Sequence, residues 1–109
     1  MTRTALVTGA SGGIGSATAR DLGTDHDVVV HYNTDRDGAE AVAADIREHD
    51  RAAIVHQCDL CDPDAVGAMV NRAREAFGGV NVLVNNAGVL HAAPLETATD
   101  EQIQGTLRV

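Results

Sequence analysis

A glycine-rich segment near the amino terminus is the part of the sequence best suited to ligand chemistry. Gly9, Gly13 and Gly15 stand in a GxxxGxG pattern directly after a short apolar run. Such glycines let a strand turn sharply into a helix and bring the backbone close to a pyrophosphate. The helix then offers free N–H groups and the positive end of its dipole to phosphates. The pattern predicts a phosphate-binding turn, although a tight turn without a ligand has the same pattern.

Two later motifs follow apolar runs in the same way. Asp59-Leu60 lies just past the third run, and Asn85-Asn86-Ala87-Gly88 ends the fourth. A carboxylate at the first place can accept a hydrogen bond from an adenine amino group. Small residues and amides at the second let the backbone pass close to a ribose and link neighbouring strands. Taken alone, Asp59 would be better explained by helix capping near Asp62.

Two cysteines offer a different chemistry. Cys58 and Cys61 form a CxxC motif, and His56 lies two residues before it. These residues could act as a redox pair or as three metal ligands. Because a fourth ligand is absent, we interpret the cysteines as small residues beside Asp59-Leu60 and expect no metal. The other histidines are expected to be mostly solvated: His26, His31, His49 and His91.

Strand-like and helix-like segments alternate along the chain and place these motifs. Short apolar runs predict strands at residues 3–8, 27–32, 52–57 and 80–84. Helical spacing of apolar residues predicts intervening helices that begin near Gly13, Thr34 and Asp62, and a last helix that begins at Thr99. The first helix is expected to turn one side inward, formed by Ile14, Ala17, Thr18 and Leu22. This alternation predicts one doubly wound α/β domain over residues 1–109 with parallel strands.

Composition excludes several classes of partner. The chain of 109 residues has a formal net charge of −8, which opposes binding to nucleic acid and to anionic membranes. Tyr32 and Phe77 are the only aromatic residues, so a stacking platform for single-stranded nucleic acid is excluded. No apolar run approaches the ~18 residues of a membrane span. With no signal peptide recognised, we expect a cytoplasmic location.

The motifs together resemble the short-chain dehydrogenase/reductase family over essentially the whole chain. The resemblance rests on TGASGGIG at residues 8–15, Asp59-Leu60, and NNAG at residues 85–88. Residues 28–33, together with Pro94-Leu95 and residues 99–102, look most like the branch containing 3-oxoacyl-carrier-protein reductases. The resemblance implies a partial Rossmann-type parallel sheet of about four strands, in the order 3-2-1-4, with helices on both faces. It also implies NAD(P)-dependent hydride transfer to or from a small carbonyl or alcohol substrate.

The same resemblance implies a set of cofactor contacts. The glycines of the turn would line the pyrophosphate, Ser11 and Gly12 would lie near the adenosine ribose, and Asp59-Leu60 would hold adenine. The complete predicted cofactor site is Gly9, Ser11, Gly12, Gly13, Ile14, Gly15, Asn33, Thr34, Asp59, Leu60, Asn86, Ala87 and Gly88.

The end of the second strand bears on the choice between NADP and NAD. A carboxylate there would bind the free ribose 2′-OH and repel a 2′-phosphate. Asn33-Thr34 stands there instead, with Arg36 close by, so NADP is favoured. Against NADP, Asp35 and Asp37 follow, and Gly12 stands where NADP-using relatives often carry Arg.

The family's catalytic residues are missing from this sequence. They are a Ser, an Asn and a Tyr-x-x-x-Lys pair, whereas Tyr32 is the only tyrosine here and there is no lysine. We therefore expect the amino-terminal part of a reductase, truncated before its catalytic half, inactive alone, and open at the sheet edge formed by residues 80–84. Two alternatives stay open: a non-catalytic nucleotide-binding module that pairs this edge with a partner, and a non-functional remnant. Members of the family are usually homo-oligomers.

Overall fold

The computed structural model describes residues 3–86 and 91–94 of the chain, and the predicted helix at Thr99 lies outside these residues. Strands and helices alternate up to β4, as predicted, with boundaries within about two residues of those expected. The elements are β1 (Arg3–Val7), α1 (Gly13–Leu22), β2 (His26–Tyr32), α2 (Arg36–Glu48), β3 (Ala53–Gln57), α3 (Pro63–Phe77), β4 (Val82–Asn85) and β5 (His91–Pro94).

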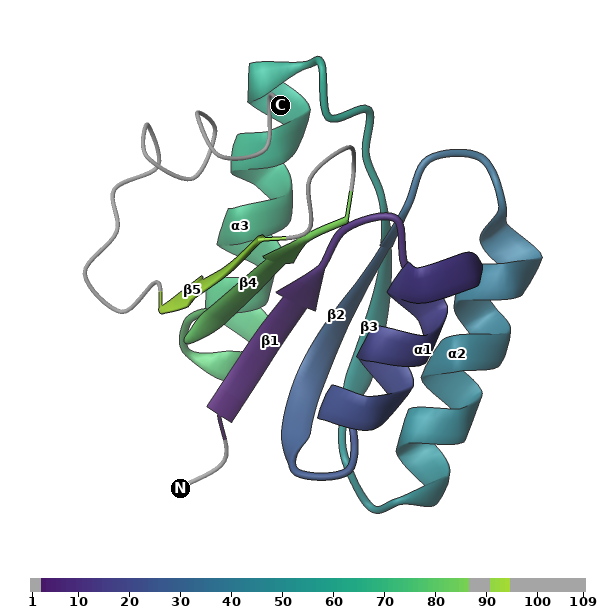
Figure 1. The fold of residues 1–109 in the computed structure, drawn as a ribbon. Helices are drawn as coiled ribbons and strands as arrows, with labels where there is room; N and C mark the ends of the chain where they lie inside the picture. The colour runs from purple at the N-terminus through teal and green to yellow at the C-terminus, as the bar shows by residue number, and fades with distance from the viewer. Residues whose placement is uncertain (1–2, 87–90, 95–109) are drawn as a thin grey trace.

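The strands form one sheet in the order β3-β2-β1-β4-β5 (Figure 1). The pairs β1–β2, β1–β4 and β2–β3 are parallel, which confirms the predicted order 3-2-1-4. Helices α1 and α2 lie on one face of the sheet and α3 lies on the other (Figure 1). The arrangement is the expected Rossmann-type unit, and it brings the carboxyl ends of β1, β2 and β3 to one edge.

The prediction that β4 forms an open sheet edge is wrong. Strand β5 pairs antiparallel with β4, with Val82 opposite Pro94 and Asn85 opposite His91. The backbone groups that we expected to be unpaired therefore bond to the next segment of the same chain. Both faces of the parallel part are apolar because helices cover both.

Two apolar clusters hold the layers together. Alternate residues of β2 point to opposite faces, so Val28 and Val30 pack with α1 and α2, whereas Val29 packs with α3. The α2 side is filled by Val42 and Ile46, among others. On the other face, α3 buries an apolar stripe formed by Val66, Met69, Val70 and Ala73, and Phe77 packs at its margin.

The buried face of α1 differs from the predicted one. Gly15, Ser16 and Ala19 are buried, while Ala17 is exposed and Ile14 is 67% exposed. The spacing of apolar residues was misleading here because α1 approaches the sheet so closely that only small side chains fit beneath it. Leu22 packs at the edge of the core, as expected.

The ends of two helices are set by aspartates. Asp62 caps α3 as predicted, because its carboxylate accepts the N–H of Asp64 at 3.0 Å, and Pro63 follows at the first position. Gly78, with φ +84°, ends that helix. At α2 the cap is Asp35, one residue after the predicted helix start at Thr34, since the Asp35 carboxylate accepts the Gly38 N–H at 2.9 Å.

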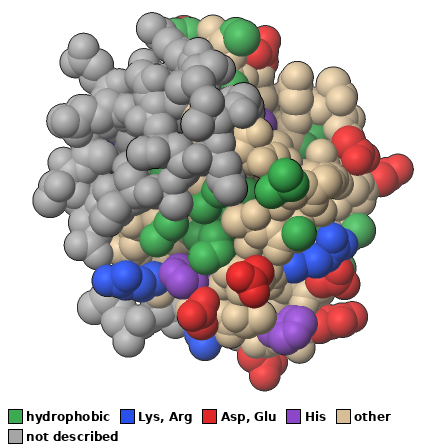
Figure 2. All heavy atoms as spheres, in the orientation of Figure 1, with side chains coloured by type: hydrophobic (Ala, Val, Ile, Leu, Met, Phe, Trp, Pro, Cys, Tyr) green, Lys and Arg blue, Asp and Glu red, His purple; other side chains and the backbone are tan. Residues whose placement is uncertain are grey.

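The outer surface agrees with the acidic composition. Figure 2 shows Asp and Glu side chains along the side formed by α1 and α2. An exposed ion pair, with Arg20 Nε 2.7 Å from an Asp45 carboxylate oxygen, joins these two helices. Within residues 3–86 and 91–94, no helix is long and apolar enough to cross a membrane.

Candidate functional site

A cavity of about 330 Å³ lies at the carboxyl ends of β1, β2 and β3. Three segments line it: the turn after β1, the end of β2, and the loop between β3 and α3. Its lining residues are Gly9, Ser11, His31, Asn33, Thr34, Cys58, Asp59, Leu60 and Cys61. Six of them belong to the predicted cofactor set, and this edge is where open α/β sheets bind ligands.

The glycines of the turn meet two different physical demands. Gly9 and Gly13 have φ values of +61° and +59°, a region that side chains disfavour. Gly15 has an ordinary conformation but no room, because an added Cβ would lie 2.0 Å from the Gly9 carbonyl oxygen. Gly12 faces open space and precedes α1 without a side-chain cap. The first N–H groups of α1 are therefore not capped by a side chain and suit a phosphate.

The NNAG motif is tied to the glycine turn. The Asn86 amide donates to the Gly9 carbonyl oxygen at 3.3 Å, and the Asn86 N–H donates to the Thr8 hydroxyl oxygen at 2.9 Å. Thr8 in turn donates to the Asn85 side-chain oxygen at 3.2 Å. These contacts fix the carboxyl ends of β1 and β4 together. Ala87 and Gly88, also predicted cofactor residues, lie outside the described residues.

Asp59 serves the local loop and lines the cavity as well. One carboxylate oxygen accepts the Cys61 N–H at 2.9 Å, which shapes the turn between β3 and α3. The other oxygen makes no hydrogen bond to any residue that the structure describes. Asp62, not Asp59, caps α3. Asp59 is therefore suited to accept a hydrogen bond from a ligand in the cavity.

The end of β2 presents two uncharged polar side chains to the cavity. Asn33 and Thr34 are exposed and line the cavity. Asp35 is engaged as the cap of α2. Arg36 is mostly exposed, with its Nε 3.9 Å from a Glu40 carboxylate oxygen.

His31 is a site residue that sequence reasoning missed. We expected solvated histidines, but His31 is only 2% exposed and lies inside the cavity wall. Its Nδ1 accepts the Gly9 N–H at 2.9 Å, and its Nε2 lies 2.7 Å from the Cys58 carbonyl oxygen. Burial lowers the pKa of His31, and the bond to Cys58 opposes this effect only in part. The one signal in the sequence was a polar residue within an apolar strand.

Gly38 is a second residue that sequence reasoning missed. A Cβ at this position would lie 2.3 Å from the Ser11 carbonyl oxygen and 2.4 Å from the Asp35 carboxylate. The first turn of α2 therefore touches the glycine turn directly. A helix-interior glycine, which is otherwise unfavourable, was the available signal.

The two cysteines of the CxxC motif lie in different environments. Cys58 is buried and Cys61 is exposed, and both are free thiols. Burial raises the pKa of the Cys58 thiol, and the carboxylates of Asp59 and Asp62 raise it further, which opposes thiolate chemistry. Across the part of the chain that the structure describes, no three His, Cys, Asp or Glu residues come together as metal ligands.

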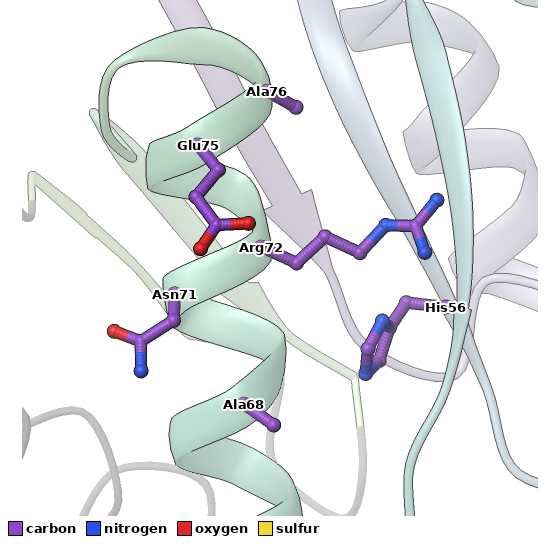
Figure 3. Close-up of a pocket in the computed structure, with 6 residues that line it drawn as sticks. All are labelled: His56, Ala68, Asn71, Arg72, Glu75 and Ala76. Carbon is purple, nitrogen blue, oxygen red and sulfur yellow. The ribbon is translucent and has the colours of Figure 1, made fainter.

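A second, larger cavity of about 660 Å³ lies between β3 and α3. Arg72 of α3 extends toward His56 of β3, as Figure 3 shows. The pKa of His56 is lowered by burial and then by the positive charges of Arg72 and His31. This cavity contains none of the predicted cofactor residues, so the smaller cavity is the better candidate for a dinucleotide.

The structure thus brings most, but not all, of the predicted cofactor residues to one place. Gly12, Gly13, Gly15 and Asn86 support the turn beside the cavity without lining it. The exposed Ile14 side chain is not part of the cavity wall.

Comparisons with known proteins agree on one family. The short chain dehydrogenase family model matches residues 3–109. The 3beta-hydroxysteroid dehydrogenase 1 of Eggerthella lenta is 37% identical over 98% of this chain and 41% of its own length. A 3-oxoacyl-acyl-carrier-protein reductase of Staphylococcus aureus is 41% identical over 82% of this chain and 37% of its own length. This chain therefore spans about two fifths of the length of these relatives.

A solved structure is similar as well. A short-chain dehydrogenase from Burkholderia cenocepacia, crystallised in complex with NADP, superposes with a TM-score of 0.76. It is 46% identical in sequence, and the match covers 98% of this chain and 44% of that one.

Proposed function

The chain belongs to the short-chain dehydrogenase family, and on that premise we propose that it binds the adenosine half of NADP in the cavity described above. The observation that carries the proposal is that one cavity is lined both by Gly9 and Ser11, in the turn that leads to the uncapped start of α1, and by the loop with Asp59 and Leu60. The first suits the pyrophosphate and the second suits adenine. Because Gly15 has no side chain, α1 packs directly against the Gly9 carbonyl, which keeps the start of the helix close to the turn.

Each segment has a distinct role in this proposal. The N–H groups at the start of α1 bind the pyrophosphate, and Asp59 accepts a hydrogen bond from the adenine amino group. Asn33 and Thr34 bind the adenosine ribose and its 2′-phosphate, with Arg36 as the nearby cation. When bound, the dinucleotide supplies the hydride carrier, and residues of this chain hold and orient its adenosine end.

The reaction that we propose for the whole protein is hydride transfer between the nicotinamide and a small carbonyl or alcohol carbon. The family's acid–base pair combines a Tyr with a Lys, whose charge lowers the phenol pKa from about 10 toward neutrality. Since this sequence holds no Lys, we propose that the 109-residue chain binds cofactor but does not turn over a ketone alone. A cytoplasmic location and a homo-oligomeric state remain predictions.

Preference for NADP over NAD is part of the proposal. Asp35 is used as a helix cap, which removes the nearest carboxylate from the ribose. The Burkholderia relative, whose structure holds NADP, supports the same choice.

A fluorescence titration tests the proposal. We expect NADPH fluorescence to change saturably on addition of the chain, with weaker binding of NADH and competition by ADP. Absence of a saturable change for both dinucleotides would contradict the proposed function.

Asn33→Asp tests the preference. A carboxylate beside the 2′-phosphate should weaken NADPH binding about tenfold or more while sparing NADH. Asn71→Asp on α3 is the matched control, because it adds the same charge at the larger cavity, away from the proposed dinucleotide site. Equal losses in both variants would show that net charge, and not the site, decides the preference.

A further inference from the structure

His31 lies between two parts of the cavity that are far apart in the sequence. Its ring accepts the Gly9 N–H at 2.9 Å on one side and lies 2.7 Å from the Cys58 carbonyl oxygen on the other. The backbone adds to this link, since the Ala10 N–H donates to the His31 carbonyl oxygen at 2.9 Å and the Cys58 N–H donates to the Tyr32 carbonyl oxygen at 3.1 Å. One residue thus fixes the glycine turn relative to the loop after β3.

The two contacts of the ring specify its protonation state. Because Gly9 donates to Nδ1, that nitrogen must be unprotonated. The carbonyl of Cys58 can only accept, so Nε2 must carry the proton. A doubly protonated ring would place an N–H against the Gly9 N–H, and the turn would have to move.

The surroundings of the ring also favour the neutral form. His56 of β3 stands opposite His31 in the strand register, and the positive charge of a protonated His31 lowers the pKa of His56. From the loop after β3, Cys58, Asp59 and Cys61 line the same cavity. The residues that face His31 from the glycine turn, Gly9 and Ser11, carry no charge. Burial also lowers the pKa of His31.

We propose that His31 is a positioning residue that holds the Gly9 turn in its ligand-binding geometry only while its Nδ1 is unprotonated. This inference rests on the proposed function, because the ligand concerned is the dinucleotide. The pyrophosphate end should depend on His31 most, since the Gly9 turn leads directly into the uncapped start of α1. Acidification should therefore weaken binding of a diphosphate more than binding of a nucleoside.

Two amide variants separate the two contacts of the ring. The Asn side-chain oxygen can take the place of Nδ1 and accept from Gly9, whereas the Gln amide reaches the place of Nε2 and donates to Cys58. We expect His31→Asn to bind ADP within about threefold of the wild type at pH 7.5 and to lose less affinity than the wild type on acidification. His31→Gln and His31→Leu should weaken ADP about three- to tenfold, the cost of one lost hydrogen bond.

Calorimetric titrations of the full chain with ADP and with adenosine, at pH 7.5 and pH 5.5, measure these effects. The expected result is a larger loss for ADP than for adenosine in His31→Gln, and a loss of ADP affinity on acidification that is larger in the wild type than in His31→Asn, since the ADP phosphate itself takes up a proton in this range in both. Equal losses for the two probes, or the same behaviour of His31→Asn and His31→Gln, would overturn the inference. His56→Asn is the control for protonation of the neighbouring histidine.

A measurement without ligand separates this inference from the proposed function. In the wild type, hydrogen exchange at the Gly9 amide, followed by NMR, should be slow at pH 7.5. It should speed up in His31→Gln but not in His31→Asn. If ADP does not bind the wild type while Gly9 follows this pattern, the proposed function and the binding part of the inference fail, and the link between His31 and the turn stands. A Gly9 amide indifferent to all three variants would refute the link itself.

Discussion

Among single residues, the glycines of the turn after β1 are required for two different physical reasons, backbone conformation and lack of space. Gly9 and Gly13 are required by their positive φ, and Gly15 by the nearness of the Gly9 carbonyl. Gly12 has neither constraint. The spacing of the motif was readable from the sequence, but which glycine serves which purpose depended on the packing of α1 against β1 and on Asn86.

Gly15→Ala should therefore lower the free energy of unfolding by about 1–3 kcal/mol, because the added methyl group forces α1 away from the turn. Gly12→Ser is the matched control, since it faces open space and adds a residue that favours the start of a helix. Urea unfolding of both variants measures the difference. An equal loss in the two variants would contradict the steric explanation.

Thiol labelling gives a second prediction. Cys61 is exposed and lines the cavity, whereas Cys58 is buried and has a raised pKa. A maleimide should therefore label Cys61 first, and bound NADPH should slow that labelling. Cys61→Ser should remove the fast phase. Fast labelling of Cys58 in that variant, or no protection by NADPH, would refute the description of the cavity.

Among the elements, the sequence predicted most of the fold because its local signals agreed with the tertiary structure. The start of α3 could be predicted from Asp62-Pro63 alone, and β2 from its run of consecutive apolar residues, without knowing what packs against either element. Strand β5 could not be predicted, because residues 91–94 carry no strand pattern and become a strand only through pairing with β4. The inward face of α1 and the burial of His31 were missed for the same reason, since both depend on contacts across the fold.

The cap of α3 gives a prediction at this scale. Asp62→Ala should lower the free energy of unfolding by about 0.5–2 kcal/mol, because the first N–H groups of the helix lose their acceptor. Asp64→Ala, which removes a charge from the same turn, should cost less than about 1 kcal/mol. Thermal unfolding of the two variants measures both effects, and a larger loss for Asp64→Ala would count against the cap.

For the whole molecule, the buried His31 and the half-buried His56 link stability to pH. Both His31 and His56 have a pKa lowered from the ordinary 6.5. As pH falls below that value, the unfolded chain takes up protons that the folded chain does not. Stability is therefore retained above about pH 6.5 and lost as pH falls toward the lower folded pKa.

Urea unfolding at pH 7.5 and pH 5.5 checks this sign. We expect lower stability at pH 5.5, and we expect His31→Asn to lose less on acidification than the wild type because it cannot titrate. If the variant and the wild type change equally, His31 is not the linked group.

The most direct test of the central claim is NMR chemical-shift mapping of the chain with ADP, because two cavities compete as its binding site. Binding at the carboxyl ends of β1, β2 and β3 predicts that the largest amide shifts fall in residues 9–15 and 59–61. Shifts confined to residues 68–76 of α3, which line the larger cavity, would contradict the assignment of the site, and no shifts at all would contradict nucleotide binding.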